Sequence, residues 1–132
     1  MPAAELVYVD SSAFVKLVLP EPETAALLAA LEGAARLVAA EVLEVEVLRA
    51  TRRGGGDLAT ARAQLAAVRM LPLSSAIRTR ASELDPPSVR SLDAIHLATA
   101  LSLAERLDRF CTYDERMALA GRQAGLDVLA PG

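Results

Sequence analysis

Short apolar runs alternate along the chain with longer segments in which apolar residues recur at helical spacing. The run LVYV at 6–9 is apolar on both faces, which is typical of a central strand in a parallel sheet. Further short runs predict strands at 36–39, 70–73, 109–112 and 126–129, of which 70–73 can also be an extended connection. Helical spacing predicts helices at 13–19, 23–32, 41–53, 58–68, 75–84, 92–105 and 115–124.

Polar residues mark where several of these helices begin. Ser11 or Ser12 is the expected N-cap of the first helix, because a side-chain oxygen there accepts a free backbone N–H. Asp57, Ser74 and Ser91 are expected to cap three later helices in the same way. Strands that alternate with helices form right-handed crossovers, so we expect an α/β fold whose parallel sheet is covered on both faces. The length of 132 residues suits a single domain over 1–132.

Composition narrows the class of protein. Hydrophobic residues make up 53% and charged residues 23%, which is typical of a globular domain. The 17 acidic and 14 basic residues leave a net charge of −3, which disfavours a basic surface that grips nucleic acid through many phosphates. Aromatic residues, at 3%, disfavour rows of stacking platforms for RNA bases.

The termini and the single cysteine suggest a location. Cys111 is the only cysteine, so no internal disulfide can form and a reducing cytoplasm is expected. No signal peptide is visible at the N-terminus. The longest apolar run is far shorter than the ~20 residues that a membrane span needs, so no membrane association is expected.

Acidic residues lie where a parallel sheet places its ligands, just after the carboxyl ends of strands. Asp10 follows the first predicted strand and Asp114 the fourth, while Asp93 lies in the first turn of the helix at 92–105. Each alone can be an ordinary residue of a helix N-terminus. If the sheet brings them together, their like charges require protons or a divalent cation, and Mg²⁺ or Mn²⁺ suits oxygen ligands.

A further acid is expected from the helix at 41–53. Glu46 falls on the same arc of this helix as Val42, Leu43 and Ala50, and an acid on an apolar arc is either paired or functional. The helix is apolar almost all round, so periodicity does not separate Glu46 from Glu41.

Four segments resemble the PIN-domain family, and within it the VapC-type toxins of type II toxin–antitoxin systems. They are VYVDSSA at 7–13, VEVLRA at 45–50, LDAIHLA at 92–98 and TYDER at 112–116. The resemblance spans nearly the whole chain, with the segments in the family's order and spacing. It implies a PIN-like three-layer α/β/α sandwich and a ribonuclease that requires Mg²⁺, with Mn²⁺ as a substitute, and leaves 5′-phosphate and 3′-hydroxyl ends.

The resemblance also implies roles for individual residues. The catalytic and metal-binding set that it implies is Asp10, Glu46, Asp93 and Asp114. In this set Glu46 takes the position of the family's glutamate. Ser12 and Thr112 match hydroxyl positions that support the first and last acids. The implied partners are an RNA substrate, a small VapB-like antitoxin and a second copy of the chain, and the RNA target cannot be read from the sequence.

Three features keep more than one interpretation. His96 can act as a general acid or base, but a packed histidine on an apolar helix is favoured. Arg49, Arg52 and Arg53 can bind RNA phosphates or an acidic antitoxin, or form a solvated helix end. Cys111 is expected to be a small buried hydrophobe.

Other functions remain as alternatives. A non-catalytic PIN-like protein-binding module is the main one. A phosphatase of the haloacid-dehalogenase type is disfavoured, because it needs an aspartate where Ser12 stands and a lysine later than Lys16. A flap nuclease needs more chain than 132 residues provide. If the four predicted site acids are set aside from the 17, 13 acids face 14 bases, so the negative balance can belong to the site.

Overall fold

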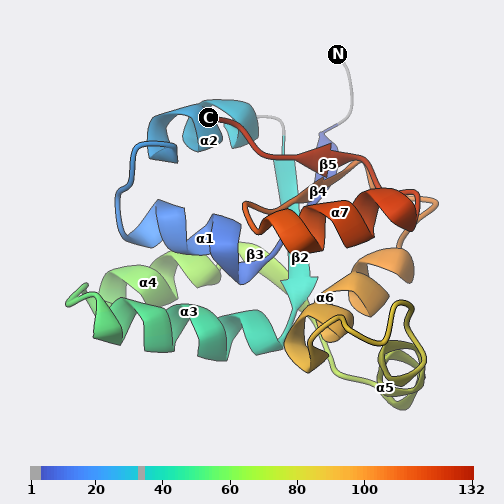
Figure 1. The fold of residues 1–132 in the computed structure, drawn as a ribbon. Coiled ribbons are helices and arrows are strands. Elements are labelled where there is room, and N and C mark those ends of the chain that lie inside the picture. The colour runs from blue at the N-terminus through green and yellow to red at the C-terminus, as the bar shows by residue number, and fades with distance from the viewer. Residues whose placement is uncertain (1–3, 33–34) are drawn as a thin grey trace.

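The computed structural model, which describes residues 4–32 and 35–132, is organised around a five-stranded parallel sheet (Figure 1). The strands are β1 (Glu5–Val9), β2 (Ala35–Ala40), β3 (Val68–Leu71), β4 (Arg109–Cys111) and β5 (Val128–Leu129). Their order across the sheet is β3-β2-β1-β4-β5, and each neighbouring pair is parallel. The predicted α/β fold with a central parallel sheet is therefore confirmed.

Helices form the outer layers of this sandwich. They are α1 (Ser11–Val18), α2 (Thr24–Leu31), α3 (Val42–Arg53), α4 (Leu58–Leu65), α5 (Ser75–Ser82), α6 (Ser91–Leu101) and α7 (Glu115–Gln123). Figure 1 shows α1 to α4 on one side of the sheet, where α1 contacts α2, α3 and α4. On the other side α6 contacts α5, α7 and β2. Among the described residues, none of the helices is long and apolar enough to cross a membrane.

The strand order reverses direction between β1 and β4. The chain winds from β1 to β2 and β3, and then crosses back so that β4 pairs with the other edge of β1. Val9, the last residue of β1, lies opposite Cys111, the last residue of β4. Ligands of open α/β sheets bind at such a switch point, beyond the carboxyl ends of the strands. The topology therefore directs attention to the residues that follow Val9 and Cys111.

Fully buried side chains lie under this switch point. Tyr8 and Phe110 are fully buried on neighbouring strands, and their rings stack with centroids 5.3 Å apart. Leu43 and Val47 of α3 are also fully buried. Such stacked, buried aromatic pairs stabilise a fold beyond the area that they bury. The strand ends that carry the candidate site thus rest on a rigid part of the molecule.

Several predicted boundaries differ from those observed. The helix predicted through 68 ends at Leu65, because Val68 begins β3 and pairs with Leu37 of β2. The helix predicted over 92–105 ends at Leu101, and its last residues form tighter turns in which Leu103 N–H donates to the carbonyl of Ala100. In both places the apolar pattern runs on past the helix end, and at Val68 pairing with β2 decides where the helix stops.

The predicted caps were partly wrong. The N-cap of α1 is Asp10, whose Oδ1 accepts from the Ala13 N–H, while the Ser12 hydroxyl is used to bind Asp10 itself. Ser91 is the first residue of α6 rather than its cap, and the residue at the cap position makes no side-chain cap bond. The expected caps at Asp57 and Ser74 are confirmed.

Truncation of a core side chain on α3 is expected to destabilise the protein. Val47→Ala removes two buried methyl groups and leaves a cavity, so the free energy of unfolding should fall by about 2 kcal/mol. Val45→Ala is the matched control, because Val45 lies on the same helix and is 61% exposed. Urea denaturation followed by circular dichroism checks this, and equal midpoints for the two variants would contradict the core position of Val47.

Candidate active site

Asp10 is the most deeply buried of the four predicted acids. It directly follows β1, and its side chain is only 3% exposed. Oδ1 accepts hydrogen bonds from the Ser12 hydroxyl at 2.7 Å and the Ala13 N–H at 3.0 Å, and Oδ2 accepts one from the Thr112 hydroxyl. Burial raises the pKa of Asp10, and these hydrogen bonds oppose the rise. Three donors therefore fix this carboxyl group at the switch point.

Asp114 enters the site from the neighbouring strand. It follows β4 and caps α7, where Oδ1 accepts from the N–H groups of Arg116 and Met117 at 2.9 and 3.0 Å. The Asp114 N–H donates to Thr112 Oγ1, so Thr112 connects Asp114 to Asp10. Asp114 is exposed, and the structure assigns no hydrogen-bond donor to its Oδ2 among the described residues.

Asp93 faces Asp114 across a cavity of about 690 Å³, which both residues line. Burial raises the pKa of Asp93, and the negative charge of Asp114 is the next largest cause. The charges of Asp10 and Glu46 act in the same direction, and His96 opposes them. The structure gives the Asp93 carboxylate no hydrogen-bond donor among the described residues. The four predicted acids therefore share one electrostatic environment.

Glu46, rather than Glu41, faces the site. Its Oε1 lies 2.6 Å from His96 Nε2, and its Oε2 accepts a hydrogen bond of 3.2 Å from the Ser11 hydroxyl. Glu41 is exposed and has a structural contact instead, since its Oε1 accepts from the Leu73 N–H at 2.8 Å. The ambiguity that helical periodicity left between the two acids is resolved by the tertiary structure.

The four acids form a loose cluster. Among the described residues, no three or more His, Cys, Asp or Glu side chains stand close enough together to hold a metal ion directly. The available ligands are carboxylate oxygens, which suit Mg²⁺ or Mn²⁺. Mg²⁺ is usually bound through one or two carboxylates and several waters, so it fits this arrangement. Asp10, Asp93, Asp114 and Glu46 are the residues that could hold it.

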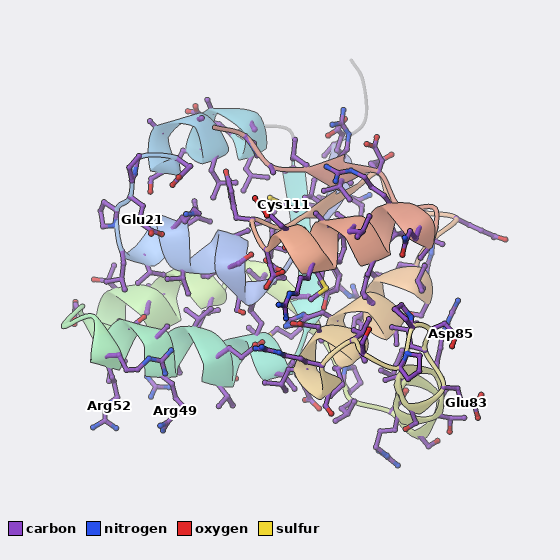
Figure 2. All side chains as sticks on the ribbon, viewed as in Figure 1. Glu21, Arg49, Arg52, Glu83, Asp85 and Cys111 are labelled. Carbon is purple, nitrogen blue, oxygen red and sulfur yellow. The ribbon has the colours of Figure 1, made fainter. Side chains whose placement is uncertain are left out.

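A second cavity, of about 650 Å³, opens on the Glu46 side of the cluster between α1 and α3. Arg49 and Arg53 line it, whereas Arg52 is not among its lining residues. Figure 2 shows Arg49 and Arg52 pointing outward from α3. Lys16 also lines the cavity, but its ammonium group is already paired with Glu21 and with another glutamate. Within the described part of the chain no ion pair is assigned to Arg49 or Arg53, so these two arginines are available to a ligand of this cavity.

Comparison with known proteins decides the family. The model of the PIN domain matches residues 7–123, which include all four predicted acids. The chain belongs to the PIN-domain family. Ribonuclease VapC46 of Mycobacterium tuberculosis is 41% identical over 126 residues, which cover 95% of this chain and 97% of that protein. The predicted resemblance to VapC-type members is confirmed.

Solved structures share the fold of this PIN domain. The crystal structure of Mycobacterium tuberculosis VapC20, a toxin that cleaves the sarcin–ricin loop, superposes with a TM-score of 0.72 at 15% identity, covering 87% of this chain and 95% of that one. A toxin–antitoxin complex from Klebsiella pneumoniae gives a TM-score of 0.70 at 21% identity, covering 96% of this chain and 98% of that one. At these identities the similarity supports the three-layer fold and no more.

Two side chains of this PIN domain contact the site in ways that their sequence pattern does not predict. His96, favoured as a packed histidine, is buried at 1% exposure but contacts Glu46 directly. Tyr8, assigned only to a strand, contacts the other nitrogen of His96. The signal available was the spacing of His96 three residues after Asp93, on the same face of α6. Cys111 is buried as expected, and Figure 2 shows it inside the molecule.

Proposed function

We propose that this chain, as a single PIN domain of residues 1–132, is a Mg²⁺-dependent endoribonuclease toxin that a cognate antitoxin inhibits. The observation that carries the proposal is the cluster of Asp10, Glu46, Asp93 and Asp114 at the switch point of a PIN domain. These acids come from four separate segments of the chain. The 41% identity to a protein named as a ribonuclease supports RNA as the substrate.

Each acid is expected to have a role at the metal site that follows from its surroundings. Asp10 is held rigidly by three donors and would anchor the metal. Asp93 and Asp114 line the first cavity, and no donor is assigned to Asp93 or to Oδ2 of Asp114 in the described part of the chain, so they would complete the ligands. Glu46 is expected to bind a metal-bound water or to orient it. A divalent cation bound there supplies a water of lowered pKa and neutralises charge on the scissile phosphate.

Cations flank the cluster on both sides. Arg90 and Arg116 line the first cavity beside Asp93 and Asp114, and Arg49 and Arg53 line the second. Arginine binds phosphate groups through paired N–H donors. We propose that the RNA backbone crosses the acidic cluster from one cavity to the other, held by these arginines. This accounts for RNA binding without a basic surface or stacking platforms.

The partners belong to the same proposal. A VapB-like antitoxin is supported by the toxin–antitoxin complex among the structural neighbours. Val45 and Leu92 line the second cavity and are 61% and 48% exposed, so they offer apolar contact to a helix of such a partner. A homodimer is the remaining expectation.

The decisive experiment measures RNA cleavage by the tag-free protein with Mg²⁺, with Mn²⁺ and with EDTA. Cleavage is expected with either metal and not with EDTA, and the product ends should be 5′-phosphate and 3′-hydroxyl. Mg²⁺ added in excess over EDTA should restore the activity, because the carboxylates bind the cation reversibly.

The main alternative is a non-catalytic binding module. Such a protein would give the same slow background in all three conditions and would not bind Mn²⁺. Cleavage that persists in EDTA would exclude the metal-dependent mechanism. A contaminating ribonuclease is detected by a preparation of Asp10→Asn purified in the same way, which must be inactive.

A further inference from the structure

A buried chain of hydrogen bonds leads from the centre of the sheet to Glu46. The Ala40 N–H donates to Tyr8 Oη at 3.0 Å, Tyr8 Oη lies 2.6 Å from His96 Nδ1, and His96 Nε2 lies 2.6 Å from Glu46 Oε1. Tyr8 is 0% exposed and His96 is 1% exposed. Their rings meet edge to face, with centroids 5.7 Å apart. The chain thus joins β2, β1, α6 and α3.

The partners at each end determine how the His96 ring is held. An ionised carboxylate only accepts hydrogen bonds, so the proton of the last contact is on His96 Nε2. The hydroxyl oxygen of Tyr8 accepts from the Ala40 N–H, and the hydroxyl, which carries its own proton, lies 2.6 Å from His96 Nδ1. Burial raises the pKa of Tyr8, so the phenol keeps this proton. Tyr8 thereby holds the His96 ring in the orientation in which Nε2 points at Glu46.

The effect on Glu46 is visible by comparison with Glu44 on the same helix. Glu46 is 20% exposed and is held at both oxygens, by His96 and by the Ser11 hydroxyl. Glu44 is exposed, and no side-chain hydrogen bond is assigned to it among the described residues. A glutamate side chain loses considerable rotamer freedom when it is fixed, so an unheld Glu46 would sample many positions. The buried pair of Tyr8 and His96 therefore fixes the position of the Glu46 side chain in advance.

We propose that Tyr8 and His96 are positioning residues that hold the Glu46 carboxylate in the orientation in which it serves the metal site. The inference rests on the proposed function and extends it to two residues that touch neither metal nor substrate. Removal of residues that orient metal ligands typically costs about 10–100-fold in metal affinity or activity. A role in packing alone would lower stability and leave both quantities unchanged.

Three variants test the chain of hydrogen bonds at different points. His96→Leu removes both ring nitrogens, His96→Gln restores an N–H donor toward Glu46, and Tyr8→Phe removes only the hydroxyl. We expect His96→Leu to lower Mn²⁺ affinity or kcat by about 10–100-fold, with partial recovery in His96→Gln and an intermediate loss in Tyr8→Phe. Mn²⁺ affinity is measured by titration of the electron paramagnetic resonance signal, and kcat by RNA cleavage.

Thr51→Val is the matched control for the loss of a buried polar group. Thr51 is fully buried on α3, the helix that carries Glu46, and its hydroxyl donates to the Val47 carbonyl of the same helix. This variant should lose stability but keep wild-type metal affinity and kcat. If His96→Leu does not fold, Tyr8→Phe still tests the chain of hydrogen bonds, because it removes only the hydroxyl oxygen, which lies at a distance from Glu46.

The chain contains one histidine, so its ring can be observed directly. Long-range proton–nitrogen NMR of the tag-free protein should show a proton on Nε2, the nitrogen that contacts Glu46. A ring with no proton on Nε2 would overturn the inference. So would wild-type Mn²⁺ affinity and kcat in both His96→Leu and Tyr8→Phe. If instead the wild-type protein fails to cleave RNA with Mg²⁺, the proposed function fails, while the NMR result still judges the hydrogen-bond chain.

Discussion

Asp10→Asn is expected to lower the rate of Mg²⁺-dependent RNA cleavage by at least about a thousandfold, because metal-bound charge stabilisation is worth several kcal/mol and each 1.36 kcal/mol is tenfold in rate. The fold should survive. Asparagine has the same shape, and its carbonyl oxygen can accept from the Ala13 N–H as Oδ1 of Asp10 does. The substitution also removes a buried charge. Cleavage of a fluorescent RNA and thermal melts in EDTA measure the two effects separately.

Asp57→Asn provides the matched control for this result. Asp57 is the N-cap of α4, and its Oδ1 accepts from the Ala59 N–H, so both substitutions change a capping aspartate. Asp57 has no part in the acidic cluster, and wild-type cleavage is expected for Asp57→Asn. Activity of Asp10→Asn within a few-fold of wild type would exclude Asp10 as a metal ligand.

Asp93→Asn is expected to reduce cleavage by roughly a hundredfold or more, and at the same time to stabilise the metal-free protein. The activity falls because a neutral amide is a poorer ligand for a hard cation than a carboxylate. Stability rises because Asp93 has no hydrogen-bond donor among the described residues, and burial and the charge of Asp114 both disfavour its ionised form. A substitution that lowers activity but raises stability is typical of a residue that is retained for function.

The stability difference should depend on pH in a defined direction. The folded-state pKa of Asp93 is raised above its usual value of 3.8, so the folded state binds the proton more readily than the unfolded state. The metal-free wild type therefore loses stability as the pH rises from about 3.8 through the raised pKa, and the full cost is present at neutral pH. The neutral amide of the Asp93→Asn variant carries no such cost. The melting temperature of this variant should exceed that of wild type most at neutral pH.

Mg²⁺ should reverse this order, since a bound cation removes the repulsion and stabilises wild type more than the variant. Asp85→Asn is a suitable control, because Asp85 is exposed and Figure 2 shows it pointing away from the molecule. It should leave activity and the pH dependence of melting unchanged. A metal-free Asp93→Asn protein less stable than wild type at neutral pH would show that Asp93 has a structural role instead.

Most of the architecture could be read from the order of apolar runs. The strand at 6–9 and the helix at 41–53 were predicted to within one residue at each end, because a long or fully apolar pattern leaves little choice. Val68 was placed in a helix although it belongs to β3, since a single apolar residue at a helix end fits either element. Pairing with Leu37 decides the matter, and that contact is distant in sequence.

The sequence also predicted that the site is acidic. It did not predict which contacts connect the acids to one another. Asp10 and Asp114 both follow predicted strands of a parallel sheet, which leaves open whether they lie together, and the structure shows that β1 and β4 are neighbours. The linkage of these two acids through Thr112 depends on the register of the two strands. Whether Glu46 or Glu41 faces the cluster depends on how α3 is rotated against the sheet.

Local pattern thus established an α/β protein with acidic residues at strand ends, and residue motifs established the PIN-domain resemblance. The contacts that give each acid its environment join segments far apart in the chain, such as Tyr8 with His96 and His96 with Glu46. Propensity and periodicity act over a few residues, so they cannot report which side chain a buried ring will meet. Packing of the helices on the sheet decides that, and it makes the buried His96 a partner of Glu46.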